Sequence, residues 1–407
     1  MAISVLYISY DGMTDTLGQS QVIPYLIGLT QKGYSITLLS CEKAENYLLH
    51  KNKIQTLLTE NNIQWKPIAY TKKPPIFSTM YDVYQLKKKA ETLHQQQHFS
   101  IVHCRSYIAA LVGVHLKEKF KIKFVFDMRG LWADERVDGK LWKLKNPIFK
   151  LVYAYFKKKE KLFLEQADCT ISLTYNAKNE IHSWKHIDNN PIKMDVIPCC
   201  VDLNLFNPIN IEPSKTQQLK KELNIEQNDF VLMYLGSIGT WYMLDEMLAY
   251  FSVLKEAKNE AKFLFITKDE HARIRKTAEK YGVLNDIRIR PGNREEIPSL
   301  ISLAHFSIFF ILPSYSKKAS SPTKQGEIMA MGIPIICNTN VGDTDKIVQD
   351  YSSGILVEHF TEIDYKNAMV KMNLSFNENE IIAGAKDYFS LENGVQKYAN
   401  VYATILS

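Results

Sequence analysis

Short apolar runs alternate with amphipathic stretches of helical period along most of the chain. Residues 3–8 form an apolar run with several β-branched side chains, which predicts a strand. After a loop, apolar side chains at positions 22, 23, 26, 27 and 29 give a helical stripe that ends at Gly33. A second strand is predicted over residues 35–39. A strand, a helix and a strand in this order predict a βαβ unit with parallel strands.

The alternation recurs, breaks at residues 196–208, where prolines occur, and then restarts. This pattern predicts an N-terminal domain over 1–200 and a C-terminal domain over 201–385. Each is expected to be a Rossmann-like, doubly wound parallel α/β sheet, and the two are expected to face a cleft. The last segment, 386–407, should pack back toward the first domain. Further strands are predicted at 101–104, 124–126, 170–173, 230–235, 262–267, 287–290, 306–312 and 333–337, and helices at 244–254 and 391–406.

Composition agrees with a globular protein of this size. The chain has 407 residues, of which 46% are hydrophobic and 23% charged, enough for two or three domains without disulfides. The net charge of +6 is unevenly spread. Residues 1–200 carry 28 Lys and Arg against 18 Asp and Glu, whereas the remainder carries 22 against 26. The basic first half is therefore expected to meet something anionic, although the excess is too diffuse for bulk nucleic-acid binding.

The six cysteines are scattered, without a CxxC pair or a nearby group of histidines. This usage predicts reduced, packed thiols and argues against a zinc site or a disulfide framework. The N-terminus lacks a basic region and a long apolar core, and no apolar run reaches the ~18 residues of a membrane span. We therefore expect a cytoplasmic protein. The cysteines are Cys41, Cys104, Cys169, Cys199, Cys200 and Cys337.

Two glycine-containing loops follow predicted strands. Gly18 lies in the first, where an uncovered helix start would offer backbone N–H groups and a partial positive charge to an anion. In the second, the amides near Gly239 and Thr240 are placed to hold phosphate oxygens. Neither loop is a GxGxxG fingerprint or a GxxxxGK[ST] P-loop, so a plain connecting loop stays an alternative for the first.

The strongest group of candidate residues lies between positions 319 and 336. Lys324 and Glu327 are three residues apart and share one face of a predicted helix. A cation near a helix start opposes the helix dipole, so Lys324 should have an anionic partner such as a phosphate. The Glu327 carboxylate suits a pair of vicinal hydroxyls such as those of a ribose. A surface Lys–Glu pair on an exposed helix is the alternative.

Three charged residues follow a buried strand in the first half. Asp127, Arg129 and Glu135 come just after the apolar run at 124–126. Because ligands bind beyond the carboxyl ends of parallel strands, these side chains are candidates for ligand contact. A structural Asp–Arg pair is the alternative.

Together these motifs resemble the GT-B fold glycosyltransferases, and within them family 4. Residues 196–208 (VIPCCVDLNLFNP) look like the family's "IPNGVD…F.P" linker. Residues 322–334 (PTKQGEIMAMGIP) are similar to the latter part of its E-x7-E motif. The resemblance implies transfer of a sugar from a nucleotide donor with retention of configuration, without a metal or other cofactor, and with the donor nucleotide bound by the C-terminal domain.

The resemblance also assigns donor-side roles. Glu327 matches the second motif Glu and is expected to bind the donor ribose, while Gly18, Gly239 and Thr240 match loops near the donor phosphates. Ala319 stands where the first motif Glu falls, so the donor-sugar contact is expected from Ser320, Ser321 or backbone amides. The family's Arg and Lys in the second loop are absent, which leaves Lys324 as the diphosphate cation.

On the acceptor side, Arg129 replaces a His of the family, and Asp127 or Glu135 is expected to orient the acceptor hydroxyl. The acceptor is expected to be a glycan or a lipid-linked glycan of cell-surface polysaccharide biosynthesis. The basic, aromatic stretch 147–166, together with the lysines at 87–89, would then rest on an anionic membrane, although 147–166 also fits an ordinary domain helix. A sugar-nucleotide epimerase of the same fold and a non-catalytic peripheral membrane scaffold are the alternative functions.

Overall fold

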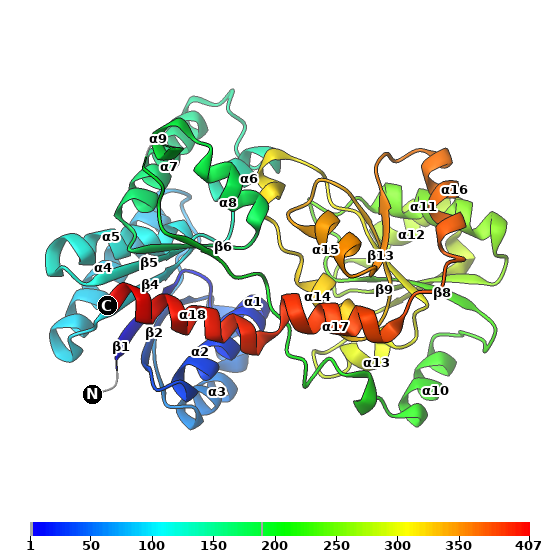
Figure 1. Cartoon of the computed structure of the whole chain (residues 1–407), viewed down its shortest axis with the longest axis horizontal. Helices are drawn as coiled ribbons and strands as arrows, with labels where there is room; N and C mark the ends of the chain where they lie inside the picture. Colours follow the sequence, from blue (N-terminus) through cyan, green and yellow to red (C-terminus); the bar gives the residue numbers. More distant parts are fainter. Residues whose placement is uncertain (1–2, 189) are drawn as a thin grey trace. The chain divides into compact units, whose positions relative to one another are not determined.

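The computed structural model describes residues 3–188 and 190–407, which form two compact units (Figure 1). Unit 1 comprises the described residues up to Pro198 together with Leu391–Ser407, and unit 2 is Cys199–Ser390. The division thus falls at 198 instead of the predicted 200. The chain returns to unit 1 at 391, five residues after the start of the predicted terminal segment.

In unit 1, the described residues form a seven-stranded parallel sheet in the order β3-β2-β1-β4-β5-β6-β7. The central strands are buried on both faces, which explains why they appear in the sequence as continuous apolar runs. β3 was not predicted because Lys66 and Pro67 interrupt its apolar pattern. The strands are β1 Ser4–Ser9, β2 Ser35–Glu42, β3 Ile63–Ala69, β4 Ile101–Arg105, β5 Lys123–Asp127, β6 Cys169–Ser172 and β7 Met194–Val196.

The helix predicted after the first loop is divided in two at Val22. Pro24 lies in the first turn of the second helix and has no N–H to continue the ladder of the first. The helices of unit 1 are α1 Thr16–Gln21, α2 Ile23–Gln31, α3 Ala44–Glu60, α4 Phe77–Gln97, α5 Ser106–Phe120, α6 Trp132–Asp138, α7 Pro147–Gln166, α8 Tyr175–His182, α9 Lys185–Asp188 and α18 Leu391–Leu406.

The C-terminal helix α18 packs against α2 within unit 1, as Figure 1 shows. Gly28 of α2 permits the close approach, because a Cβ there would lie 2.5 Å from a methyl carbon of Val395. Tyr34 adds a hydrogen bond from its hydroxyl to the carbonyl of Ala399. The end of the chain is therefore part of the first unit's core.

In unit 2, the described residues form a six-stranded parallel sheet in the order β10-β9-β8-β11-β12-β13. The two sheets confirm the predicted fold class of paired Rossmann-like units. β11 ends three residues before its predicted end, and β12 starts after Pro334. The strands are β8 Phe230–Leu235, β9 Ala261–Ile266, β10 Ile287–Arg290, β11 Phe306–Phe309, β12 Ile335–Asn338 and β13 Gly354–Val357.

Helices cover this sheet and bury a core that is rich in aromatic side chains, including Tyr234, Tyr250, Phe251, Phe263 and Phe265. The helices of unit 2 are η1 Pro208–Asn210, α10 Pro213–Glu222, α11 Leu244–Ala257, α12 His271–Lys280, η2 Leu284–Asp286, α13 Ile297–Ile301, η3 Tyr315–Ala319, α14 Thr323–Ala330, α15 Thr344–Asp350, α16 Glu362–Lys371 and α17 Glu378–Phe389.

Two further expectations concern the cysteines and the membrane. All six cysteines are buried free thiols, which confirms the prediction of packed, unpaired cysteines. Within residues 3–188 and 190–407, no helix combines the length and the apolar character that a membrane span requires.

Candidate functional site

The loop after β1 is built around the carboxylate of Glu42, the last residue of β2. The Met13 N–H donates to Oε1 (2.7 Å), and Thr14 donates to Oε2 from both its N–H (3.1 Å) and its hydroxyl (2.6 Å). The Ser40 hydroxyl donates to Oε1 as well (2.6 Å). Glu42 is only 3% exposed. These donors make the buried charge tolerable, since a carboxylate without partners would be strongly destabilising there.

Gly18 serves the packing of this loop. It is a buried residue inside the six-residue helix α1, and a Cβ there would lie 2.2 Å from the carbonyl oxygen of Gly12. The amides of Met13 and Thr14, which precede α1, already donate to Glu42. A contact between Gly18 and a donor phosphate stays a prediction.

Asp127 lies at the end of β5, as predicted, but it is 1% exposed. Its Oδ2 accepts a hydrogen bond from the Tyr398 hydroxyl (3.0 Å) and lies 3.5 Å from Nε2 of His103. Its Oδ1 lies 3.7 Å from the guanidinium of Arg129. The structure thus supports the alternative of a structural pair: Asp127 ties α18 to the sheet. Its carboxylate makes these contacts within the core, and its predicted role of orienting an acceptor hydroxyl stays a prediction.

The charges around Asp127 set the protonation of this cluster. Burial alone would raise the pKa of Asp127, but the Arg129 charge and the His103 contact outweigh it and lower the pKa below its usual range. Burial lowers the pKa of His103, so its imidazole is neutral near pH 7. The cluster is therefore an Asp–Arg ion pair with a neutral histidine beside it.

The carboxyl edge of the unit 1 sheet carries two non-glycine residues in the left-handed backbone region. Ser106 (φ +67°) directly follows β4, and Arg129 (φ +57°) closely follows β5. Such strained positions cluster at binding sites, because the surrounding structure must hold them. The Arg129 side chain is 8% exposed. Glu135 lies further on, in α6, and is partly buried.

Sequence reasoning missed an ion pair at the same edge. Arg105, the last residue of β4, donates to the Asp11 carboxylate in the loop after β1 (2.5 Å). Arg105 is 5% exposed at its side chain, whereas Asp11 is 43% exposed. Both residues lie at the end of a parallel strand, and that position is the signal by which they could have been found.

In unit 2, Lys324 is a buried cation on the first turn of α14. Its side chain is enclosed although the residue type is rarely buried, with 7% of the residue exposed. Nζ donates to the Tyr234 hydroxyl (3.1 Å) and lies over the rings of Tyr234 (4.2 Å) and Tyr242 (3.7 Å). Gly236 (φ +112°) lets the loop pass close by, since a Cβ there would lie 3.2 Å from Nζ.

The alternative, a surface ion pair between Lys324 and Glu327, does not form among the described residues. Glu327 instead accepts a hydrogen bond from Arg294 (3.3 Å), which comes from the loop after β10 and was not predicted. Burial lowers the pKa of Lys324 well below its ordinary value, because the charges of Glu327 and Asp269 offset only part of it. Burial likewise raises the pKa of Glu327, and Arg294 opposes the rise only in part.

The loop after β8 is fixed by another residue that the sequence did not reveal. Asp269 accepts hydrogen bonds from the Ser237 hydroxyl (2.7 Å) and from the Ile238 N–H, and Arg273 donates to the Ile238 carbonyl (3.2 Å). Gly239 and Thr240 follow in the same loop, and Thr240 is exposed. Because α11 begins only at Leu244, their amides lie in a loop and not at a helix start.

The segment before α14 shows where the missing motif carboxylate would have stood. Ala319 ends η3 and is 3% exposed, so this position faces the protein interior. The Ser321 hydroxyl accepts a hydrogen bond from the N–H of Cys199 (3.1 Å). Ser321 can still donate its own proton, so its predicted role toward a donor sugar stays a prediction.

Paired Rossmann-like units with these motifs define the GT-B fold class. A model of Glycosyltransferase Family 4 matches residues 25–205, and a model of Glycosyl transferases group 1 matches residues 215–376. The chain belongs to the family 4-like glycosyltransferases of the GT-B fold.

The curated relatives that this chain matches share less than a quarter of its residues. A D-inositol 3-phosphate glycosyltransferase of Segniliparus rotundus is 23% identical over 270 residues, which cover 65% of this chain and 56% of the relative. Another of the same description, from Thermomonospora curvata, is 20% identical over 295 residues, covering 70% of this chain and 65% of the relative. Each match therefore spans less than two thirds of the relative.

Solved structures share the fold over nearly the whole chain. A glycosyltransferase from Rickettsia africae has a TM-score of 0.73 at 15% identity, covering 100% of this chain and 99% of that one. Anabaena HepE, solved with UDP and glucose, has a TM-score of 0.70 at 14% identity, covering 98% and 99%. A putative UDP-N-acetylglucosamine 2-epimerase from Listeria monocytogenes has a TM-score of 0.59 at 10% identity, covering 98% and 95%. Likeness at this level shows the fold alone.

A first prediction concerns the buried Lys324. Because its folded-state pKa is depressed, its destabilising effect is full at low pH and fades as the pH rises toward the unfolded-state value of about 10.4. Lys324→Met should therefore unfold with a free energy higher by about 1–3 kcal/mol at neutral pH, and this gain should shrink toward pH ~10. Urea unfolding of both proteins between these pH values measures it. If the free energies of unfolding of the two proteins changed in parallel with pH, Lys324 would not have the depressed pKa of a buried lysine.

A second prediction concerns Glu42. Glu42→Gln replaces one acceptor oxygen by an NH2 group and leaves a buried donor of the loop unpaired, so the free energy of unfolding should fall by about 1–3 kcal/mol. Glu45→Gln, on the exposed start of α3, is the matched control and should change it by less than about 0.5 kcal/mol. Equal effects of the two changes, measured by urea unfolding, would contradict the role of Glu42 as the centre of the loop.

Proposed function

We propose that the protein transfers a sugar from a nucleotide-sugar donor to a glycan or lipid-linked acceptor, with retention of anomeric configuration. The observation that carries this proposal is the environment of Lys324. The ammonium of Lys324 is buried and contacts two aromatic rings and one hydroxyl. Among the described residues no carboxylate is in ion-pair contact with it, so binding of an external anion would stabilise its charge. The diphosphate of a nucleotide sugar supplies such an anion.

The donor chemistry follows from the groups in unit 2. As the glycosidic bond breaks, positive charge develops on the anomeric carbon and negative charge on the departing diphosphate. Lys324 stabilises that leaving group, assisted by the loop amides at Gly239 and Thr240. Glu327, held by Arg294, binds the ribose hydroxyls. These residues supply the charge without a metal ion, and the UDP held by HepE makes a uridine nucleotide the first donor to test.

On the acceptor side, the proposal places Arg129 and Glu135 near the reacting hydroxyl. Arg129 is held in the left-handed region beside the buried Asp127, which fixes where its guanidinium lies. The exposed Asp11, held by Arg105, is a further candidate for orienting the hydroxyl, a role predicted for Asp127 or Glu135. The acceptor hydroxyl attacks on the face of the leaving group and passes its proton to the departing phosphate.

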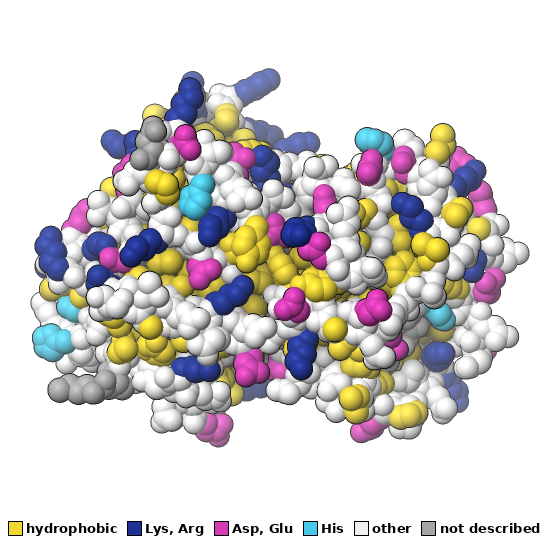
Figure 2. Space-filling model, in the orientation of Figure 1, with side chains coloured by type: hydrophobic (Ala, Val, Ile, Leu, Met, Phe, Trp, Pro, Cys, Tyr) yellow, Lys and Arg dark blue, Asp and Glu magenta, His cyan; other side chains and the backbone are white. Residues whose placement is uncertain are grey.

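The acceptor is anionic and lipid-linked in this proposal, and the enzyme works in cell-surface polysaccharide biosynthesis at the cytoplasmic face of a membrane. The excess of lysine and arginine in residues 1–200 supports an anionic acceptor. In the view of Figure 2, lysine and arginine side chains lie over the part of unit 1 around α7.

An epimerase would bind the donor without needing an acceptor, and such enzymes share this fold. The two family models favour transfer. A non-catalytic scaffold would have no use for the buried Lys324 of α14. Nor would it need Glu327 of the same helix to be held by Arg294 of the loop after β10.

The third prediction tests donor binding directly. UDP-glucose and a panel of other nucleotide sugars are added to the protein, and at least one should raise the melting temperature. Lys324→Ala should weaken that binding by about 10- to 150-fold, the loss of one charge-assisted contact. Lys346→Ala, an exposed lysine of α15, is the matched control and should bind as the wild type does.

The result also separates the functions. Incubation with the bound donor alone should yield no epimer, whereas an epimer would establish the isomerase. If no nucleotide sugar shifts the melting temperature, the proposed transferase is refuted and the scaffold is favoured.

A further inference from the structure

Helix α4 carries an apolar stripe that faces away from the core. Phe77, Met80, Tyr81 and Tyr84 are 70%, 64%, 53% and 60% exposed, and their spacing of three and four residues places them on one side of the helix. The buried residues of α4 form a different stripe: Ser78, Asp82, Leu86, Ala90, Leu93 and His94. The helix therefore has two apolar faces, and only one of them is covered by unit 1.

The charges around this stripe are of one sign. Lys72 and Lys73 precede it, and the lysines at positions 87–89 follow it. The single acidic residue between positions 71 and 90 is Asp82, which is fully buried. Its carboxylate accepts hydrogen bonds from the Tyr10 hydroxyl (2.9 Å) and the Thr71 N–H (3.1 Å). The exposed face thus combines large apolar side chains with lysines and has no acidic side chain of its own.

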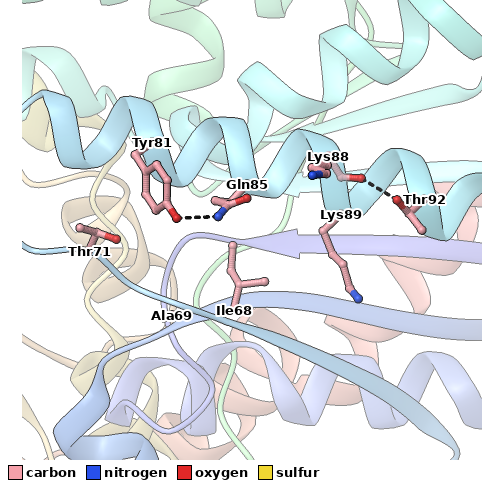
Figure 3. A pocket seen from close by; sticks show the side chains of 8 residues that line it. All are labelled: Ile68, Ala69, Thr71, Tyr81, Gln85, Lys88, Lys89 and Thr92. Carbon is pink, nitrogen blue, oxygen red and sulfur yellow. Dashed lines mark hydrogen bonds between the residues drawn. The ribbon is translucent and has the colours of Figure 1, made fainter.

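A groove of about 350 Å³ lies beside the stripe, between β3 and α4 (Figure 3). Figure 3 shows Tyr81 and Gln85 joined by a hydrogen bond (2.7 Å) along one side of it. The lining offers hydroxyl, amide and ammonium groups and no carboxylate, which suits an anionic headgroup. It consists of Ile68, Ala69, Thr71, Tyr81, Gln85, Lys88, Lys89 and Thr92.

Helix α7, the membrane element that the sequence indicated, is only partly available for such contact. Lys157 pairs with Asp134 (2.8 Å) and Glu160, and Phe156 and Phe163 are buried. The opposite face of α7 is exposed at Ile148 (57%), Leu151 (71%) and Tyr155 (47%). Only this exposed face of α7 is therefore available for contact with a membrane.

One lysine of α4 lies near enough to a lysine of α7 for their charges to interact. Burial and the nearby charge of Lys159 on α7 lower the pKa of Lys87 on α4. Two like charges held close together favour an anion between or over them, because the anion relieves the repulsion.

We propose that the outer face of α4, with the groove beside it, docks unit 1 on an anionic membrane leaflet. Phe77, Met80, Tyr81 and Tyr84 enter the interfacial region, and Lys72, Lys73, Lys88 and Lys89 contact lipid phosphates. Charge complementarity selects an anionic partner, and a stripe of two helical turns, about 10 Å long, matches shallow insertion better than a stable protein interface. The inference rests on the proposed function, in which a lipid-linked acceptor must be reached.

The test is sedimentation with vesicles of phosphatidylcholine alone and of phosphatidylcholine mixed with phosphatidylglycerol, at low and at high salt. The wild type should bind the anionic vesicles at low salt, bind less at high salt and leave the neutral vesicles unbound. Lys88→Glu with Lys89→Glu should reduce the partition by at least about 20-fold, and Phe77→Ser with Tyr84→Ser by about tenfold.

Matched controls come from unit 2. Ile363→Ser with Val370→Ser removes two exposed apolar side chains from α16, and Lys220→Glu with Lys221→Glu reverses two neighbouring charges on α10. Both should sediment as the wild type does. Near-ultraviolet circular dichroism checks that each variant is folded, which is expected because the altered side chains are exposed or, at Lys220, half-buried.

Three results would overturn the docking surface. The first is wild-type protein that does not sediment with anionic vesicles. The second is binding of the α4 variants that equals that of the controls. The third is a concentration-dependent dimer that only the α4 variants abolish. Melting-temperature shifts with UDP-glucose, measured on the same samples, separate this outcome from the proposed function. A persisting donor shift would leave the transferase standing while the docking surface falls.

Discussion

The site in unit 2 depends on one unfavourable placement: the ammonium of Lys324 buried beneath the loop that follows β8. Two tyrosine rings and one tyrosine hydroxyl contact it, and Gly236 lies close by without a side chain that would crowd it. Aromatic faces attract a cation but do not replace its hydration, so the free protein holds Lys324 at a depressed pKa. In the proposed function a donor diphosphate removes this penalty, so that binding of the anion is coupled to the charging of the lysine.

Unit 1 buries a charge of the opposite sign, a carboxylate, and stabilises it with its own residues. Its loop after β1 presents two amides and the Thr14 hydroxyl, and the Glu42 carboxylate already receives them together with the Ser40 hydroxyl of β2. Two topologically equivalent loops therefore differ in what they lack. The loop of unit 1 already encloses the Glu42 carboxylate, whereas the loop of unit 2 lies on a cation that no described carboxylate pairs with. This difference is the reason for proposing a donor site in the acidic-leaning half of the chain, where net charge alone argued against it.

The sequence was informative where a structural element or a candidate site depends on a local pattern of residues. β8, β10 and α18 begin and end at the predicted residues, because continuous apolar runs and a clear helical stripe mark them. Lys324 and Glu327 were found from their spacing within a motif. Contacts between distant segments were not accessible: Asp127 is occupied by Tyr398, 271 positions away, and Glu327 by Arg294. The stripe on α4 escaped because an apolar stripe normally faces a core, and only the structure shows that Leu86 and its neighbours fill that role.

The central claim is that Lys324 takes up a proton and meets the donor diphosphate. Calorimetric titration with UDP, in two buffers of different ionisation enthalpy between neutral pH and pH about 9, reports the protons exchanged on binding. The account predicts that wild-type protein takes up protons when UDP binds and that Lys324→Met binds more weakly without this uptake. Equal proton exchange and equal affinity in the two proteins would contradict it.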